Sequence, residues 1–191
     1  MKNRGVWAFG LALFALVSTA CDAVEDRFEP TVYKSFLYIA YQGISDPDGA
    51  EPGRISAFEF DEGSGALTVL PGSPFAGAWS PSSIVANPSE RFIYLTDYDE
   101  LYGEGISISA IDPATGALTE VTAGSPFVPW ANSAAVAPSG KWIFAGSGID
   151  RVFAFAIDQL TGALTAVAGS PFAVGSSCVV VSPSGTFGYA I

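Results

Sequence analysis

The chain of 191 residues has no histidine and only two cysteines, Cys21 and Cys178. A Ser-His-Asp catalytic triad is therefore excluded in this chain, because its general base is a histidine. Zinc sites built from histidine or paired cysteines are excluded as well, since zinc takes three or four such ligands. These absences remove two large classes of hydrolase site before any motif is considered.

Charge is scarce, and most of it has one sign. Only 14% of the residues are charged, and 8 basic residues stand against 19 acidic ones, for a formal net charge of −11. Nucleic-acid binding requires clustered Lys and Arg to neutralise phosphates, whereas these basic residues are few and scattered. We therefore expect no nucleic-acid partner. The 49% hydrophobic content is sufficient for a sizeable core.

The first twenty residues have the layout of an export signal. Lys2 and Arg4 precede an apolar run over residues 6–17, and small residues at 18–20 precede Cys21. A helix over that run rises about 18 Å, which is too short for a bilayer core of ~30 Å, so a transmembrane interpretation is disfavoured.

Cys21 resembles the lipidated cysteine of bacterial lipoproteins, which becomes the first residue of the mature protein. Ser18 departs from that pattern, which usually has Leu three residues before the cysteine, so plain cleavage after Ala20 or Ala23 remains an alternative. We expect an exported protein at the cell envelope, attached to the membrane only through a lipid on Cys21. The predicted divisions are a signal peptide over 1–20, an acidic tether over 21–33 and a folded domain over 34–191.

The folded part consists of repeats. Three motifs recur in step: Gly-Ala-Leu-Thr from residues 65, 116 and 162, Gly-Ser-Pro-Phe from 72, 124 and 169, and Pro-Ser from 88, 138 and 183. Periods of this size indicate stacked supersecondary units. Gly or Pro interrupts the chain every ten residues or so, and the segments between are β-branched and aromatic, which disfavours helical repeats.

Each period contains four strand-like segments, most clearly at residues 133–137, 142–147, 152–157 and 163–167. Four short strands per repeat predict the blade of a β-propeller. The order of the motifs resembles the seven-bladed propeller lactonases, whose best-known members hydrolyse 6-phosphogluconolactone. The resemblance covers Phe36 to Ile191 and implies an all-β propeller of four-stranded antiparallel blades.

The strands present fall short of a closed ring. By analogy with such propellers, residues 83–87, 133–137 and 178–182 form innermost strands, and the first sheet has none of its own. We count about three blades plus part of a fourth, whereas closed propellers have about 4 to 8 blades. The sequence therefore predicts the front part of a longer propeller, which the remaining blades or a second copy would close.

Any site is expected on the face with the irregular loops, at residues 42–53, 97–105 and 146–151. Variable loops on a rigid scaffold commonly carry function, whereas uniform turns serve structure. The two tryptophans at this channel mouth could stack on a sugar ring or pack between blades. The ligand-lining candidates are Trp79, Ser83, Asp99, Trp130, Asn132, Ser133, Arg151 and Ser177.

Lactone hydrolysis needs a base or an activated water and a group that stabilises the developing oxyanion. The loop side chains that qualify by chemistry are Asp97, Asp99, Glu100, Asp150 and Arg151. Acidic residues on exposed loops of an anionic protein also serve as solvating charges, and this interpretation stays open. The lactonase resemblance implies Arg and His just after a proline, at the channel end of the innermost strand. The matching positions hold neither type: Ser82, Ser83, Asn132, Ser133, Ser177 and Cys178.

Calcium is the one cofactor for which the sequence offers ligands. An acidic cluster supplies carboxylate oxygens, and its members are Asp97, Asp99, Glu100 and Glu104. Its spacing fits no EF-hand, and residues 46–49 lack the Glu that such a loop has at its twelfth position. We otherwise expect no metal and no cofactor. Cys178 is predicted to be a buried residue of an innermost strand rather than a reactive thiol.

Two functions fit these observations. One is an exported lactonase-like propeller that hydrolyses a sugar lactone. The other is a non-catalytic envelope propeller that binds a protein or glycan partner through its variable loop face. Export favours the second function, since phosphogluconolactone is a cytosolic metabolite.

Overall fold

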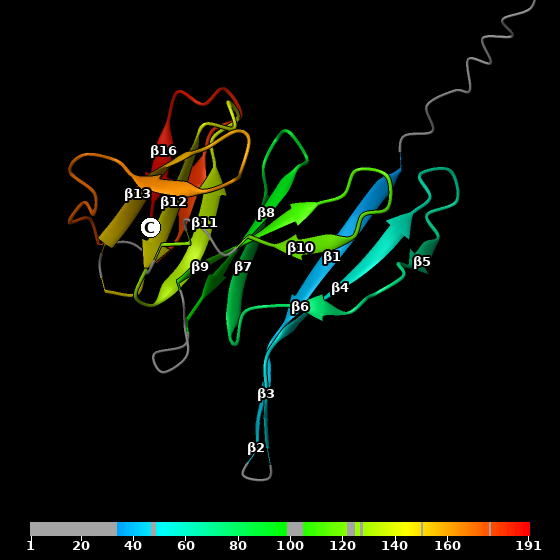
Figure 1. The fold of residues 1–191 in the computed structure, drawn as a ribbon. Helices are drawn as coiled ribbons and strands as arrows, with labels where there is room; N and C mark the ends of the chain where they lie inside the picture. Colours follow the sequence, from blue (N-terminus) through cyan, green and yellow to red (C-terminus); the bar gives the residue numbers. More distant parts are fainter. Residues whose placement is uncertain are drawn as a thin grey trace, which may run out of the picture. The chain divides into compact units, whose positions relative to one another are not determined.

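The structure is a computed structural model that describes residues 34–46, 49–98, 105–121, 125–126, 128–149, 151–175 and 177–191. The predicted signal peptide, the acidic tether and Cys21 lie outside the described residues. Every helix or strand in the described part is a β-strand (Figure 1). Within that part, no helix is long and apolar enough to span a membrane.

The first sheet is built mainly from three antiparallel strands. They are β1 (Ser35–Tyr41), β4 (Arg54–Phe60) and β5 (Leu67–Val69), in that order, and the short β6 (Phe75–Ala76) also pairs with β4. Among the described strands, β1 pairs only with β4. The prediction that the first sheet lacks an innermost strand agrees with this pairing.

The next two sheets each have the four antiparallel strands of a propeller blade. The second sheet runs in the order β10 (Leu118–Glu120), β9 (Ile106–Ile111), β8 (Phe92–Asp97), β7 (Pro81–Ala86). The third runs in the order β11 (Ala131–Val136), β12 (Trp142–Ser147), β13 (Arg151–Ile157), β14 (Leu164–Ala166). A further two-stranded sheet consists of β15 (Val179–Val181) and β16 (Gly188–Ala190).

The fold class is therefore all-β, with four-stranded antiparallel blades in an incomplete propeller, as predicted. Two innermost strands begin earlier than expected, because Pro81 pairs with Asp97 and Ala131 pairs with Ser147 beyond a register shift. The expectation of an irregular loop over residues 42–53 is wrong. That segment forms a β-hairpin of β2 (Ile44–Asp46) and β3 (Gly49–Glu51).

Successive sheets pack face to face, and we call the side toward the next sheet along the chain the front face and the other the back face. Strand β8 is buried on both faces. Its back-face residues Ile93 and Leu95 join a core with Ile55 of the first sheet. Its front-face residues Phe92 and Tyr94 belong to the core that includes the third sheet. The alternation of strand side chains thus joins three sheets through one strand.

The Gly-Ala-Leu-Thr motif is the contact point between sheets. Tyr38 donates a hydrogen bond from its hydroxyl to the Gly116 carbonyl at 2.9 Å, and Tyr94 donates to the Gly162 carbonyl at 3.2 Å. A Cβ atom at Gly116 would lie 2.6 Å from a ring carbon of Phe36, and one at Gly162 would lie 2.6 Å from Phe92. The two junctions therefore use the same contact: an aromatic pair on one sheet against a glycine turn on the next.

The turns before these glycines are closed by aspartates. The Asp112 carboxylate accepts hydrogen bonds from the backbone of Ala114 and Thr115, and Asp158 accepts from Leu160 and Thr161 in the same way. These bonds hold the pKa of both carboxyls below its ordinary value, because hydrogen bonding favours the charged form. The pKa of Asp61 is lowered by the equivalent bonds from Ser64.

Candidate ligand site at the channel mouth

Asp97 ends β8 on the loop face where the sequence predicts the channel mouth, and its carboxylate accepts hydrogen bonds from backbone amides. The side chain is buried, and its two oxygens accept hydrogen bonds from the Trp79 amide at 2.9 Å and the Ser80 amide at 3.1 Å. A buried carboxylate needs such donors to offset its loss of hydration. Asp97 therefore fixes the loop before β7, which gives a structural account of a residue considered for catalysis and for calcium.

The third sheet repeats this arrangement with a serine. Ser147 ends β12, is fully buried, and donates a hydrogen bond from its hydroxyl to the Pro129 carbonyl. By strand register, Ser147 corresponds to Asp97, and Pro129 therefore corresponds to Trp79. Trp79 and Trp130 therefore lie in the matching loops before β7 and β11, one residue out of register with each other.

Three side chains meet around Gly148, directly after β12. A Cβ atom at Gly148 would lie 3.3 Å from the Asn132 amide nitrogen, 3.5 Å from the Tyr98 ring and 3.6 Å from the Cβ of Trp130. The Gly148 amide also donates a 2.9 Å hydrogen bond to the Trp130 carbonyl. Tyr98 comes from the second sheet and the other residues from the third, so the cluster bridges two blades. We call Tyr98, Trp130, Asn132 and Gly148 the channel-mouth cluster.

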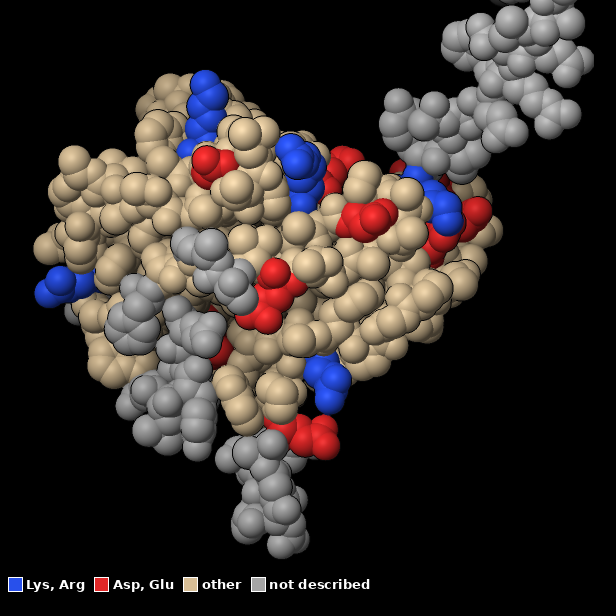
Figure 2. Space-filling model, viewed as in Figure 1, with Lys and Arg blue, Asp and Glu red and all other residues tan. Residues whose placement is uncertain are grey.

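The chemistry of this cluster suits a neutral polar ligand. Tyr98 is 47% exposed, and Trp130 and Asn132 are half-buried. Aromatic rings offer an apolar face for the carbon skeleton of a sugar, while the amide of Asn132 offers both a donor and an acceptor. On the side of the molecule in Figure 2, charged side chains are scattered and most of the surface is uncharged.

The serine candidates mainly connect neighbouring innermost strands. Ser133 accepts a hydrogen bond at its hydroxyl from the Val179 amide at 2.9 Å. Ser82 lies 2.8 Å from the Thr96 hydroxyl and donates to the Ala131 carbonyl of the next sheet. These contacts support the predicted placement of the strands around a channel, and they commit the hydroxyls of both serines to the scaffold.

The remaining candidates are spread out. Ser83 is half-buried on β7, and its carbonyl lies 3.5 Å from the Thr96 hydroxyl. Ser177 is exposed, and its amide donates to the Ile191 carbonyl at 2.9 Å. Arg151 is exposed at the start of β13, paired in register with Ser147. The acidic candidates outside the described residues are Asp48, Asp99, Glu100, Glu104 and Asp150.

Metal binding finds no support in the part of the chain that the structure describes, where no group of three or more His, Cys, Asp or Glu side chains could hold an ion. The calcium hypothesis depends on loop residues beyond that part. Cys178 corrects another expectation, because it is exposed rather than buried. No described strand covers the front of β15–β16, so Cys178 remains exposed although it lies next to an innermost strand.

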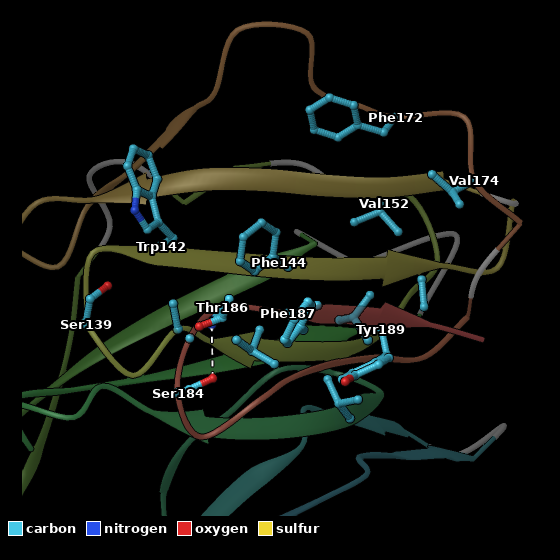
Figure 3. Close-up of a pocket in the computed structure, with 17 residues that line it drawn as sticks. Ser139, Trp142, Phe144, Val152, Phe172, Val174, Ser184, Thr186, Phe187 and Tyr189 are labelled. Carbon is cyan, nitrogen blue, oxygen red and sulfur yellow. Dashed lines mark hydrogen bonds between the residues drawn. The ribbon is translucent and has the colours of Figure 1, made fainter.

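Two cavities in the described part of the chain lie apart from the channel-mouth cluster. A cavity of about 150 Å³ lies between the first and second sheets, beside Trp79, Asp97 and Glu120. A larger cavity of about 570 Å³ lies on the front face of the third sheet and is lined mainly by apolar side chains (Figure 3). The larger cavity lies over an apolar sheet face and is not a polar site. We therefore assign the candidate ligand site from the side chains of the channel-mouth cluster.

Tyr98 is the site residue that the sequence analysis missed. Tyr98 follows Asp97 in a loop whose acidic residues predict catalysis or calcium binding. The tyrosine itself carries no such signal. The signal available in the sequence was the alignment of Asp97-Tyr98 with Ser147-Gly148. A glycine opposite a large ring leaves room for that ring, which is the relation that the structure shows.

Stacked four-stranded antiparallel sheets, joined through their faces and arranged around serine-lined innermost strands, define a β-propeller protein. The family model for lactonases with a seven-bladed β-propeller matches residues 32–190. The chain therefore belongs to the seven-bladed β-propeller lactonase family. Among curated protein sequences, no match to this chain is found.

Solved structures with a similar fold include a putative 6-phosphogluconolactonase from Bacteroides uniformis, at 19% identity and a TM-score of 0.55 over 80% of this chain and 47% of that one. A functionally unknown protein from Desulfotomaculum acetoxidans has 21% identity and a TM-score of 0.54, over 68% of this chain and 37% of that one. Sqt1 from Chaetomium thermophilum has 18% identity and a TM-score of 0.53, over 82% and 37%. The chain thus spans less than half the length of these structures, and at this identity the likeness concerns the fold.

Proposed function

We propose that this chain belongs to an exported lactonase-like propeller whose channel mouth binds a neutral sugar lactone. The observation that carries the proposal is the channel-mouth cluster, where the Tyr98 ring, the Asn132 amide and the Cβ of Trp130 meet around Gly148 at the junction of two blades. The family membership makes a lactone the natural ligand class. Hydrolysis in the whole protein would draw its base and its oxyanion-stabilising group from residues outside this cluster.

Charge favours an unphosphorylated lactone. The cluster of Tyr98, Trp130 and Asn132 contains no cation, and the chain has a net charge of −11. A phosphate group is usually held by Arg, Lys or a helix N-terminus, and it would be repelled by an anionic protein. A neutral ring lactone needs only stacking and hydrogen bonds, which the cluster can supply.

The test is a titration of the full chain with D-glucono-1,5-lactone and, in parallel, with its 6-phosphate, followed by tryptophan fluorescence. Tyr98→Ala should raise the dissociation constant for the neutral lactone about fivefold, because a stacking contact is worth about 1 kcal/mol. Tyr189→Ala removes a tyrosine outside the cluster that is 56% exposed, against 47% for Tyr98, and should leave that constant unchanged. Equal effects of the two substitutions, or tighter binding of the phosphate ester, would contradict the proposed site.

Catalysis is measured separately, as the rate of lactone ring opening above the spontaneous rate. Acceleration that Tyr98→Ala reduces would place hydrolysis at this mouth. Binding of lactones and oligosaccharides without any acceleration would instead favour the non-catalytic envelope propeller, for which the uncharged cluster already provides a glycan-compatible surface.

Export and anchoring belong to the same proposal and have their own test. The full chain expressed in a bacterium should partition with membranes and carry the mass of an attached lipid. Cys21→Ser should move it to the soluble fraction without that mass. A wild-type chain that is cleaved and soluble would overturn the anchor while leaving the lactone site untouched.

A further inference from the structure

The second sheet has two serines on the face that it turns toward the first sheet. Ser107 and Ser109 on β9 pair in register with Leu95 and Ile93 of β8, whose side chains lie on the back face. Residues directly opposite each other on an antiparallel pair share a face, so both serine side chains are on the back face as well. The junction between the first and second sheets therefore has two hydroxyls beside its apolar core.

The third sheet has phenylalanine at both of these positions. By strand register, Phe153 and Phe155 on β13 correspond to Ser107 and Ser109 on β9. The two rings stack with their centroids 6.5 Å apart, and Phe155 is 3% exposed in the core between the second and third sheets. The earlier junction lacks both rings, and the cavity of about 150 Å³ lies there.

An acidic residue lies next to these serines on the outermost strand. Glu120 pairs with Ser109, whereas the corresponding residues are Val69 in the first sheet and Ala166 in the third. Glu120 lines the cavity together with the buried Asp97. The sequence thus places a charge at this junction where the other two sheets have an aliphatic side chain.

The polar groups of the cavity are not matched by groups of the described chain. Ser109 is 8% exposed, and within the part of the chain that the structure describes its hydroxyl makes no hydrogen bond. Every fully buried side-chain oxygen or nitrogen in that part has a partner, so the Ser109 hydroxyl is one that the cavity reaches. The described residues that line the cavity include no Lys or Arg, so its two carboxylates have no counter-charge among them.

We propose that this cavity binds a small organic cation through a primary ammonium group. The carboxylates of Asp97 and Glu120 supply the negative charge, and the hydroxyls of Ser107 and Ser109 accept hydrogen bonds from the ammonium. The wall that the first sheet contributes is apolar at Ile55 and suits the carbon chain of the cation. We call Asp97, Ser107, Ser109 and Glu120 the amine pocket.

Size and ligands favour an organic cation over a metal ion. One water molecule takes about 30 Å³ of liquid, so a cavity of about 150 Å³ has room for several heavy atoms. Calcium usually takes about 6–8 oxygen ligands, and no group of three or more acidic, His or Cys side chains that could hold an ion is present among the described residues. A primary ammonium needs only as many acceptors as it has N–H groups, and the amine pocket supplies them.

The test is a titration of the full chain with n-butylammonium, followed by the amide chemical shifts of the ¹⁵N-labelled protein. Cys21→Ser is present in every version so that no lipid interferes. Binding should be saturable in the millimolar range, with the largest shifts at Ser107, Ser109 and Glu120. n-Butanol has the same carbon chain without the charge and should bind at least tenfold more weakly. Calcium chloride should give no saturable shift at these amides.

Two substitutions test the pocket from within. Ser109→Phe introduces the ring that the third sheet has at this position and should abolish the saturable shifts, and Ser109→Val repeats the test with a smaller side chain. Glu120→Gln removes the charge of an exposed side chain and should raise the dissociation constant at least fivefold. Glu51→Gln removes an exposed charge outside the cavity and should leave that constant unchanged. The melting temperature of each variant shows that it is folded.

Four results would overturn the proposal. Absence of any saturable shift would mean that the cavity holds only water, and equal affinities for butylammonium and butanol would mean that the carboxylates take no part. Equal effects of Glu120→Gln and Glu51→Gln would mean that only the net charge of the chain matters. Tighter binding of calcium at the same amides would make the pocket a metal site. None of these results depends on whether the channel mouth binds a lactone.

Discussion

Position 162 requires glycine for two separate reasons. Its φ is +76°, which an L side chain rarely adopts, and a Cβ atom would lie 2.6 Å from the ring of Phe92. The ring is 3% exposed and packed in the core, so it cannot move aside. At Gly65 only the first reason applies, since its φ is +74° but a Cβ atom there would meet nothing within 4 Å. Comparing Gly162 with Gly65 therefore separates the cost of a positive φ from the cost of a steric clash.

We predict that Gly162→Ala destabilises the protein more than Gly65→Ala does. Both substitutions place a side chain at positive φ, which costs about 1 kcal/mol. Gly162→Ala adds overpacking against Phe92, for about 1–3 kcal/mol more. Chemical denaturation at a protein concentration low enough for monomers measures both values. Equal losses would mean that the sheets shift freely and that the tight contact does not constrain the junction.

The turn aspartates predict a specific response to acid. In the folded protein the pKa values of Asp61, Asp112 and Asp158 lie below the ordinary 3.8, because the carboxylates accept turn hydrogen bonds. Their ionised forms therefore stabilise the folded state above about pH 4, and this contribution is lost as the pH falls below that value. Replacing all three with Asn should flatten the decline in unfolding free energy between about pH 5 and 2.

Chemical denaturation across that pH range measures the effect. Glu51→Gln, which removes an exposed acidic group outside the turns, is the charge control and should leave the slope unchanged. A triple variant with the slope of the unsubstituted chain would show that the turn bonds form equally in the unfolded chain.

At the scale of strands, the sequence predicts most of the regular structure and misses what depends on three-dimensional context. The predicted segment 142–147 coincides with β12, and the predicted segment 152–157 lies within β13, because alternation and flanking turns define them. The β2–β3 hairpin was missed, since its strands have three residues each and Ile44 is their only β-branched residue. The channel-mouth cluster was found only in part, because Tyr98 joins it through its opposition to Gly148 in another blade.

Strand β8 joins the second sheet to both of its neighbours, and the Tyr94 hydroxyl tests the junction with the third sheet. The hydroxyl donates to the Gly162 carbonyl at 3.2 Å from a buried position. Burial also raises the pKa of Tyr94 to about 12, so the group stays neutral over the ordinary pH range. Tyr94→Phe should cost about 1 kcal/mol of unfolding free energy, the usual net value of a buried hydrogen bond.

Tyr38→Phe is the matched comparison, because Tyr38 makes the same bond to Gly116 from a more exposed position. We expect a smaller loss there, since water can replace the missing partner. The third sheet has Phe144 at the corresponding place, which indicates that the ring is the constant part of the contact and the hydroxyl an addition. A larger loss at Tyr38 than at Tyr94 would contradict this ranking.

At the scale of the whole molecule, burial is distributed unevenly along the row of sheets. Every residue of β8 is buried, whereas β16 is exposed throughout and pairs only with β15 among the described strands. Local opening requires little free energy where few apolar groups are buried, and approaches the global value in the core. Amide hydrogen exchange should therefore be slowest in β8 and fastest in β15 and β16, by several orders of magnitude in protection factor. Equal protection factors in β8 and in β15–β16 would contradict this ranking.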